Sequence, residues 1–374
     1  MRLFFLIICC LCLGACVPTR PAEAPGIRAV TPQEAVGIND AVNRSQRARL
    51  GEDGRYTILA LSGGGADGAF AAGVLNGWSQ SGERPKFDVV TGVSTGALIS
   101  VFAFMGPAYD GLLKQLYTSG NRDDILQDRG LQGLFSDALY DNAPLKKQIE
   151  RLVTPAFVEA VAREHRAGRR LYVATTNLDG GELVVWDMGA LAAGEGGGRA
   201  NKVQTFQKVL RASAAIPVFF PPVYIKPTRG VQLRQAHVDG GLKAPVLVSD
   251  FIFDVPAKRR ELYLIISGKL ALEDANAPVK PELRSIAGKS VRALMQELTH
   301  QAVYRAYVRA RLTGTDYNVT AIPDRIPPLA DPLAFEVDYL RRIYKIGFDD
   351  AIKGNGFWWK EPPTLKRFDR VSRR

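Results

Sequence analysis

The chain has 374 residues, of which 46% are hydrophobic and 23% charged. This balance is that of a globular protein and excludes a disordered or collagen-like chain. The formal net charge of +11 favours anionic partners such as acidic membrane surfaces.

The cysteines and histidines limit the chemistry of the chain. Its four cysteines all lie within the first sixteen residues, and it has three histidines in total. The body of the protein can therefore form neither a disulfide nor a thiolate metal site, and a His-rich metal centre is not expected. The sequence predicts no metal and no cofactor.

The N-terminal residues are typical of an export signal. After Arg2, residues 3–13 form an apolar run of eleven residues, whereas a membrane-spanning helix needs about 20. The run ends in Leu13-Gly14-Ala15-Cys16, which resembles the lipobox of bacterial lipoproteins. This resemblance implies cleavage before Cys16 and lipidation of Cys16, and Val17 in place of Asp implies outer-membrane sorting. The alternative is an ordinary signal peptide with an incidental cysteine.

The rest of the chain divides into a tether and one domain. Residues 16–54 are proline-rich and read as a tether, with a short helical stretch at 33–50. Residues 55–374 alternate strands with helices, which predicts an α/β fold: a three-layer α/β/α domain around a mostly parallel sheet, with a C-terminal extension from about 250. The expected strands are 56–61, 87–91, 171–176, 183–186 and 262–266, and the expected helices are 70–78, 97–105, 143–152, 203–214 and 289–312.

A candidate nucleophile lies where the second strand meets its helix. The segment Gly92-Val93-Ser94-Thr95-Gly96 has the Gly-x-Ser-x-Gly pattern of a nucleophile elbow, in which small residues permit the sharp turn that exposes the serine. The N-terminus of the following helix adds a positive dipole and free N–H groups. A glycine-rich turn with a buried serine is the alternative.

A second glycine-rich segment, Gly63-Gly64-Gly65-Ala66-Asp67-Gly68, follows the first strand directly. Consecutive glycines let backbone N–H groups approach an anionic oxygen, as an oxyanion hole requires. A phosphate-binding loop of the Walker type would need Gly-Lys-Ser/Thr at its end, which this segment lacks. A dinucleotide-binding loop and a plain turn remain as alternatives.

The nucleophile also needs a base. His165 lies in a charged run that predicts a solvated surface, and His300 lies within a long predicted helix, although the order Ser94…Asp…His300 is allowed for a Ser-His-Asp site. An aspartate can accept the proton directly in a desolvated site. Asp179-Gly180-Gly181 separates two alternating strands and predicts a hairpin turn, whereas Asp239-Gly240-Gly241 fits no simple hairpin.

These motifs together resemble the patatin-like phospholipase family. Its pattern is a glycine-rich loop after the first strand, Gly-x-Ser-x-Gly after the second and a late Asp-Gly-Gly. The segment Ala212-Ser213-Ala214-Ala215-Ile216-Pro217 is similar to the block that precedes the catalytic aspartate of the family. The resemblance spans residues 58–245, about half of the chain, with four motifs in order.

The resemblance implies a lipid acyl hydrolase without a cofactor. Ser94 would be the nucleophile and Asp239 its base, with His237 only a neighbour of the dyad. Gly63, Gly64 and Gly65 would form the oxyanion hole, and the motif glycines Gly68, Gly92, Gly96, Gly240 and Gly241 would shape the turns. One residue departs from the family: Asp67 stands where many members have Arg or Lys, so we expect its carboxylate to face away from the site.

Two further function classes remain open. One is a catalytically silent envelope lipoprotein with the same fold, and the other is a Ser-His-Asp esterase that uses His300. Transfer of the acyl group to an acceptor other than water is chemically close. The expected partners are a lipid or phospholipid substrate and a membrane bound through Cys16, with no nucleic acid; the sequence makes no prediction of oligomeric state. A lid is expected at residues 120–134 or 194–198.

Overall fold

The computed structural model describes residues 54–363, apart from 196–200, 227–233, 254, 256, 271–277, 280 and 328–332. The expected signal, the tether, the helical stretch at 33–50 and the basic C-terminal end lie outside these residues. Among the helices within them, none is long and apolar enough to cross a membrane.

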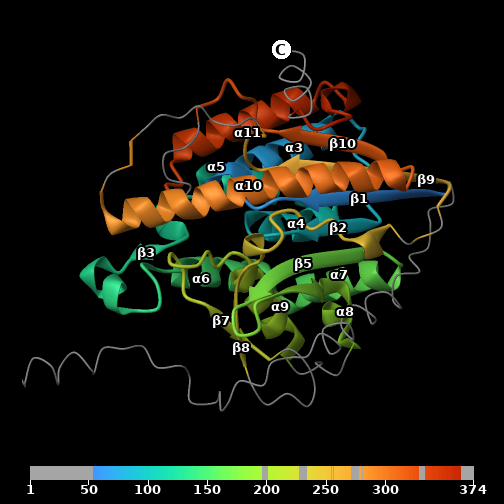
Figure 1. Ribbon diagram of the computed structural model, residues 1–374. Helices are drawn as coiled ribbons and strands as arrows, with labels where there is room; N and C mark the ends of the chain where they lie inside the picture. Colours follow the sequence, from blue (N-terminus) through green and yellow to red (C-terminus); the bar gives the residue numbers. More distant parts are fainter. Residues whose placement is uncertain are drawn as a thin grey trace, which may run out of the picture.

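One eight-stranded sheet organises the molecule, in the order β10-β9-β1-β2-β5-β8-β7 with β6 paired to β5 (Figure 1). The pairs β1–β2, β1–β9, β9–β10 and β2–β5 are parallel, whereas β5–β6, β5–β8 and β7–β8 are antiparallel. The strands are β1 (Arg55–Leu61), β2 (Val89–Gly92), β5 (Arg170–Asn177), β6 (Glu182–Asp187), β7 (Val223–Ile225), β8 (Gln235–Asp239), β9 (Arg259–Ile266) and β10 (Asp316–Ala321), and a separate small ribbon joins β3 (Gln127–Asp128) to β4 (Tyr140–Asp141).

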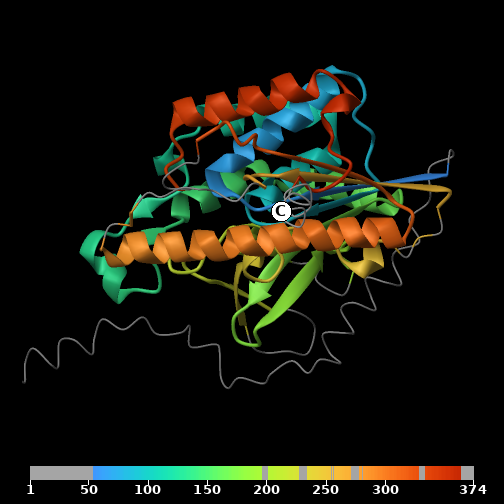
Figure 2. The same cartoon turned by 45° about the horizontal axis from the view of Figure 1, so that its top comes forward.

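Helices cover both faces of the sheet, as the sequence predicts. The helices are α3 (Gly68–Gln80), α4 (Thr95–Met105), α5 (Asp110–Ser119), α6 (Ala143–Leu152), α7 (Pro155–Arg166), α8 (Met188–Ala193), α9 (Lys202–Ser213), α10 (Leu283–Leu312) and α11 (Val337–Ala351). Figure 2 shows α3 and α11 on one side of the sheet and α10 on the other.

The side chains of β1 show why two cores form. Successive side chains of a strand point to opposite faces. Leu59 and Leu61 accordingly join the core cluster that includes α3, α4, α9 and α11, whereas Ile58 and Ala60 join the cluster beneath α10. A strand buried on both faces reads as a continuous apolar run, which is the pattern of residues 56–61.

The residues beyond 250 complete the same sheet. β9 lies parallel to β1 along its whole length, from Arg55 opposite Arg259 to Leu61 opposite Ile265. α11 packs closely on α3 through small residues, because a Cβ at Gly73 would lie 2.0 Å from the Tyr344 carbonyl oxygen. The C-terminal extension is therefore part of the layered domain.

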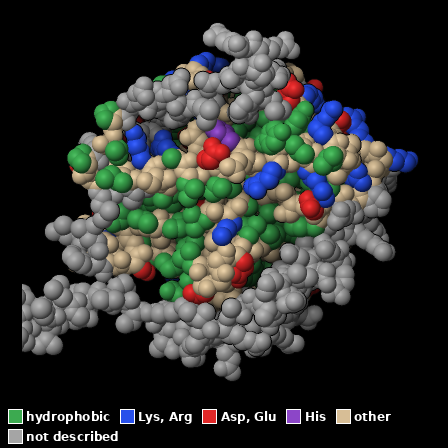
Figure 3. Space-filling model, viewed as in Figure 1, with side chains coloured by type: hydrophobic (Ala, Val, Ile, Leu, Met, Phe, Trp, Pro, Cys, Tyr) green, Lys and Arg blue, Asp and Glu red, His purple; other side chains and the backbone are tan. Residues whose placement is uncertain are grey.

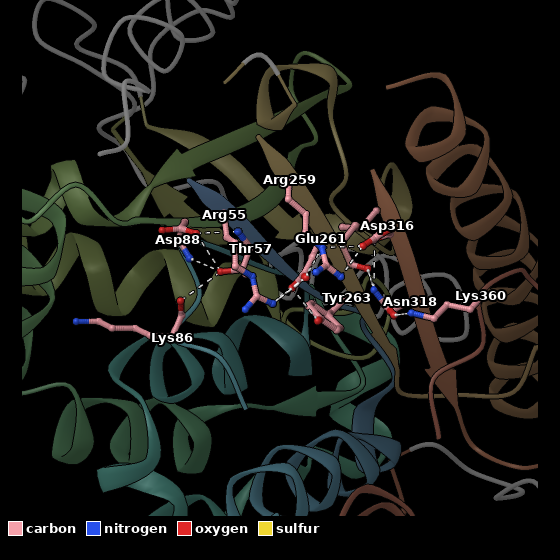
Figure 4. A network of polar contacts seen from close by, with 11 residues as sticks. Arg55, Thr57, Lys86, Asp88, Arg259, Glu261, Tyr263, Asp316, Asn318 and Lys360 are labelled. Atoms are coloured by element: carbon pink, nitrogen blue, oxygen red, sulfur yellow. Dashed lines mark hydrogen bonds and ion pairs between the residues drawn. The ribbon is translucent and has the colours of Figure 1, made fainter. Parts of the chain in front are cut away.

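Polar contacts join the ends of β1 and β9 that lie away from Ser94 (Figure 4). The Glu261 carboxylate is 2% exposed, accepts from Arg55 at 2.8 and 3.0 Å and lies 3.0 Å from Arg259. The Tyr263 hydroxyl donates to it at 3.0 Å. Asp88, which precedes β2, accepts from the Thr57 N–H at 2.7 Å. These contacts join neighbouring strands at one end of the sheet. Ser94 lies at the opposite end.

Within the described residues, all the strands and helices expected from the sequence are present, with ends shifted by up to six residues. The hairpin turn expected at Asp179-Gly180-Gly181 joins β5 to β6, and Asp179 accepts from the Ala236 N–H at 3.0 Å. The sequence did not predict the helices α5, α7, α8 and α11 or the strands β3, β4, β7, β8 and β10. Helix α7 is amphipathic and begins with a Thr154 cap, so its signal was present.

Candidate active site

Ser94 occupies the sharp turn between β2 and α4. Its backbone has φ 56° and ψ −128°, a positive φ that a serine rarely adopts. The turn is crowded, because a Cβ at Gly96 would lie 2.4 Å from the Ser62 carbonyl oxygen and a Cβ at Gly92 2.4 Å from that of Gly96. These contacts require glycine on both sides of the serine, and the geometry is that of a nucleophile elbow.

A second serine holds this turn in place. The Ser94 N–H donates to the Ser213 hydroxyl oxygen at 3.0 Å, and the Ser213 hydroxyl donates to the Ala174 carbonyl at 2.7 Å. Ser213 is fully buried at the end of α9. It links the strained turn to β5, a role that sequence reasoning did not assign to it.

The topology brings Asp239 to the same place. β6 occupies one edge of β5 over residues 172–177, so β2 and β8 share the other edge. β2 ends with Gly92 opposite Val173, and β8 ends with Asp239 opposite Thr175. The turn that follows β2 therefore meets the end of β8. The Ser94 hydroxyl lies near enough to Asp239 to lower the pKa of that carboxyl.

Burial makes the Asp239 carboxyl a stronger base than an ordinary aspartate. The residue is fully buried, and this raises its pKa to about 7; the Ser94 hydroxyl and the Gly241 N–H offset only part of the rise. Oδ1 accepts from the Gly241 N–H at 2.7 Å, while Oδ2 has no hydrogen-bond partner among the described residues. Oδ2 is the oxygen left to receive a proton.

The glycine-rich loop lies against the nucleophile, and its three glycines have different roles. A Cβ at Gly63 would lie 3.1 Å from the Ser94 Cβ. The Gly63 N–H, however, donates to the Pro245 carbonyl at 3.1 Å, so this expected oxyanion-hole donor already has a hydrogen-bond partner. Gly64 caps the 3-10 turn η2 (Gly65–Asp67), and Gly65 is its first residue. N–H groups at such a start have no partner within the turn, which leaves those of Gly64 and Gly65 as candidate donors.

The other motif glycines are sites of close packing. A Cβ at Gly68 would lie 2.4 Å from the Thr95 hydroxyl, and one at Gly240 2.5 Å from the Ala174 carbonyl oxygen. A Cβ at Gly241 would lie 2.5 Å from the Met295 methyl group of α10. These glycines therefore allow the loop, the sheet and α10 to approach Ser94 and Asp239.

The histidines are not placed as a base for Ser94. His237 is fully buried, its Nδ1 lies 2.9 Å from the Thr175 hydroxyl, and burial lowers its pKa to about 4. Within the described ranges, no hydrogen bond or ion pair joins His300 to Ser94 or Asp239, and its Nε2 has no partner. The expectation for His165 is wrong: it is 5% exposed and lies between Asp187 and Glu195, at 3.7 and 3.2 Å, because its helix turns it inward.

An apolar cavity of about 110 Å³ opens beside Ser94. Its walls come from α4, α5, α6, α9, α11 and the segment before α11, and they include Leu98, Phe102, Ile149, Leu210, Phe220 and Leu340. Gly120 and Asn121, at the start of one expected lid segment, also line it. The shape and lining suit a hydrocarbon chain whose carbonyl end lies at Ser94.

Asp67 is held by α11 and is not among the residues that line the cavity. The Tyr339 hydroxyl donates to its carboxylate at 2.5 Å, and burial together with Asp67 raises the pKa of Tyr339. The carboxylate is therefore engaged away from the cavity, as we expected.

Among the described residues, no group of three or more His, Cys, Asp or Glu is arranged to hold a metal ion. Cys16 and most of the second expected lid segment, 194–198, lie outside the described residues.

The mostly parallel sheet between helical layers, with a strained serine at a strand-to-helix turn, defines an α/β/α protein with the architecture of a serine hydrolase. The model of the patatin-like phospholipase family matches residues 59–252, just over half of the chain, so this protein belongs to that family. The family acts on lipids as acyl hydrolases.

Among solved structures, the chain is similar to VipD from Legionella pneumophila, with a TM-score of 0.43 and 13% sequence identity, over 80% of this chain and 66% of VipD. It thus spans just under two thirds of that protein. No curated protein matched the sequence.

Proposed function

We propose that the protein is a serine lipid acyl hydrolase of the phospholipase A, lysophospholipase or esterase type, working through a Ser94–Asp239 dyad. The main support for the proposal is the position of Ser94 beside Asp239. A serine on a strained turn lies beside a buried carboxyl with a pKa near 7, at the mouth of an apolar cavity. A base with a pKa near the working pH is the most effective general base.

The geometry supports a two-step hydrolysis of a carboxylic ester. Asp239 accepts the Ser94 proton as Oγ attacks the acyl carbonyl carbon, and the N–H groups of Gly64 and Gly65 stabilise the oxyanion. Asp239 then returns the proton to the departing alcohol, which leaves the acyl group on Ser94. A water molecule, deprotonated by Asp239, attacks this ester, releases the fatty acid and restores the Ser94 hydroxyl.

The position of Asp67 favours this function over a catalytically silent lipoprotein. A carboxylate aimed at the developing oxyanion would oppose the reaction, but the Tyr339 hydroxyl binds this one outside the cavity lining. Release of fatty acid from phospholipid vesicles and of nitrophenol from nitrophenyl esters tests the proposal. Both should be lost in Ser94→Ala; equal turnover by wild type and Ser94→Ala would refute it.

The same proposal includes a lipid anchor at Cys16 and residence in the bacterial envelope, at the outer membrane. Its support is the lipobox-like Leu13-Gly14-Ala15-Cys16 with Val17 after it. Attachment at the surface that holds the substrate raises the local substrate concentration. Mass spectrometry of the N-terminal peptide should find acyl chains on Cys16, and Cys16→Ser should move the protein out of the outer-membrane fraction. An unmodified Cys16 would contradict this part of the proposal.

A further inference from the structure

Helix α10 crosses the front of the molecule and carries an exposed row of hydrophobic side chains. Ile286, Leu294 and Tyr304 are 48%, 53% and 48% exposed, and Val308 and Leu312 are also exposed. At 100° per residue these five side chains fall within an arc of about 80°. Figure 3 looks onto this face and shows hydrophobic side chains along the helix and in the area below it, with Lys and Arg beside them.

The charge of α10 is strongly positive. Over its 30 residues it has six Lys and Arg side chains and a single carboxylate, Glu297. Lys289, Arg305 and Arg311 are exposed at the borders of the hydrophobic row, whereas Arg309 pairs with Asp250 at 3.1 Å. Exposed Glu297 and Gln301 fall within the same arc and divide the row into two hydrophobic groups, Ile286 with Leu294 and Tyr304 with Val308 and Leu312. Exposed hydrophobic groups bordered by basic residues are suited to contact with the interface of an anionic membrane.

The opposite face of α10 rests on the catalytic region. Met295 contacts Gly241, which follows the catalytic Asp239 closely, and Phe219 lies 3.5 Å from where a Gly288 Cβ would be. Among the residues 285–301 whose exposure is described, none is buried. In the C-terminal half of the helix, by contrast, Ala302, Val303, Ala306 and Ala310 are buried. The N-terminal half of α10 therefore covers the site with little buried area of its own.

We propose that the outward face of α10 docks on an anionic lipid surface and thereby places the active site against the bilayer. This docking rests on the proposed function, because a lipid acyl hydrolase has its substrate in a lipid surface. Charge complementarity selects this partner over a second copy of the chain, since a two-fold contact through α10 would bring two strongly basic helices together. Anionic headgroups attract the same helix.

Vesicle binding tests the docking separately from catalysis. Protein that begins at residue 16 and carries Cys16→Ser and Ser94→Ala has no apolar signal, no acyl chains and no candidate nucleophile, so neither membrane insertion of the signal, nor lipidation, nor lipid cleavage contributes to binding. We expect it to bind phosphatidylcholine vesicles that contain phosphatidylglycerol more tightly than vesicles of phosphatidylcholine alone. Hydrogen–deuterium exchange of peptides from residues 283–312 should slow on the anionic vesicles.

Substitutions on and off the helix provide the matched comparison. In the same background, Ile286→Ser with Leu294→Ser should weaken vesicle affinity about tenfold, the effect of losing one buried aliphatic side chain or more. Ile352→Ser, at a residue 42% exposed beyond α11, should leave it unchanged. The docking would be overturned if hydrogen–deuterium exchange in α10 did not change on the vesicles, or if Ile352→Ser weakened vesicle affinity as much as the α10 substitutions do. Self-association through α10, with vesicle binding unchanged by the α10 substitutions, would also overturn it.

The two proposals fail in different ways. If the docking is correct and the proposed function is wrong, vesicle binding and α10 protection persist while the otherwise native protein hydrolyses no ester. If the function is correct and the docking is wrong, Ile286→Ser with Leu294→Ser hydrolyses vesicle lipid as fast as wild type. If both are correct, this variant loses turnover on anionic vesicles and keeps its turnover of soluble nitrophenyl esters.

Discussion

The hydroxyl of Ser213 accepts a hydrogen bond from the N–H of Ser94 at 3.0 Å, across 119 residues of sequence. Because Ser94 adopts a positive φ, its turn needs support from outside, and Ser213 provides it by also donating to Ala174 on β5. Ser94 is thus positioned by the helix α9, which precedes Asp239 in sequence.

Removing this support should reduce catalysis as well as stability. Ser213→Ala leaves the Ser94 N–H without its partner, and we expect kcat/KM for a soluble ester to fall at least about tenfold, with a loss of about 1–2 kcal/mol in the free energy of unfolding. Ser100→Ala is the matched control, because the buried Ser100 hydroxyl donates only to Ala97 within α4, at 2.8 Å. Equal kcat/KM losses in the two variants would contradict the positioning role.

Activity should rise with pH through the pKa of Asp239. Only the ionised carboxylate can accept the Ser94 proton, and burial raises its pKa to about 7. A profile of kcat/KM against pH for a soluble ester should therefore climb and level off above about pH 7. If kcat/KM were instead constant around pH 7 and changed only near the ordinary pKa of an aspartate, Asp239 would not be the base.

The same shift predicts a pH-dependent gain in stability when the charge is removed. A carboxyl whose folded-state pKa lies above its unfolded value stabilises the fold in its protonated form, and this contribution is lost as pH rises through about 7. Asp239→Asn should consequently unfold at a higher temperature than wild type at alkaline pH, with a smaller difference at acidic pH. Thermal melts at both pH values measure this, and a difference of opposite trend would contradict it.

The cavity should set the preference for acyl-chain length. Leu98 lies on α4 one turn after Ser94 and lines the cavity. Leu98→Trp fills space needed by a long chain, so we expect about a tenfold fall in kcat/KM for long-chain nitrophenyl esters and little change for acetate or butyrate. Leu98→Met conserves volume and should keep the wild-type profile. A parallel fall for all chain lengths in Leu98→Trp would place the acyl chain elsewhere.

The polar contacts at the far end of the sheet should affect stability alone. Glu261→Gln replaces the carboxylate that pairs with Arg55 and Arg259, and both arginines are partly exposed. We expect a loss of about 1–2 kcal/mol in the free energy of unfolding, measured by denaturant titration, with kcat/KM unchanged. A large fall in kcat/KM without loss of stability would contradict the separation of these contacts from the site.

The sequence was enough to predict the layered fold, because its first strands are continuous buried runs followed by local glycine-rich motifs. The pairing of Ser94 with Asp239 was expected from the family resemblance alone, because β8, which carries Asp239, was not predicted. The sequence could not show which backbone N–H groups of the glycine-rich loop would already have a hydrogen-bond partner. The Gly63 N–H is taken by Pro245, a contact that depends on the path of the chain after β8. The inward turn of His165 was hidden by its charged neighbours, although α7 is amphipathic.

The residues that contact Asp67 and Gly241 could not be predicted from the sequence either. Tyr339 on α11 and Met295 on α10 come from the part of the chain beyond the recognised motifs. Their contacts arise from tertiary packing and leave no local pattern at either end.

Labelling by a fluorophosphonate probe tests the central claim most directly, with mass spectrometry to locate the adduct. If Ser94 is a nucleophile activated by Asp239, the wild type carries the adduct on Ser94, Ser94→Ala carries none and Asp239→Asn reacts much more slowly. His300→Ala should label like wild type, which separates the dyad from a Ser-His-Asp site. Absence of an adduct on folded wild type, or equal labelling of wild type and Asp239→Asn, would contradict the account.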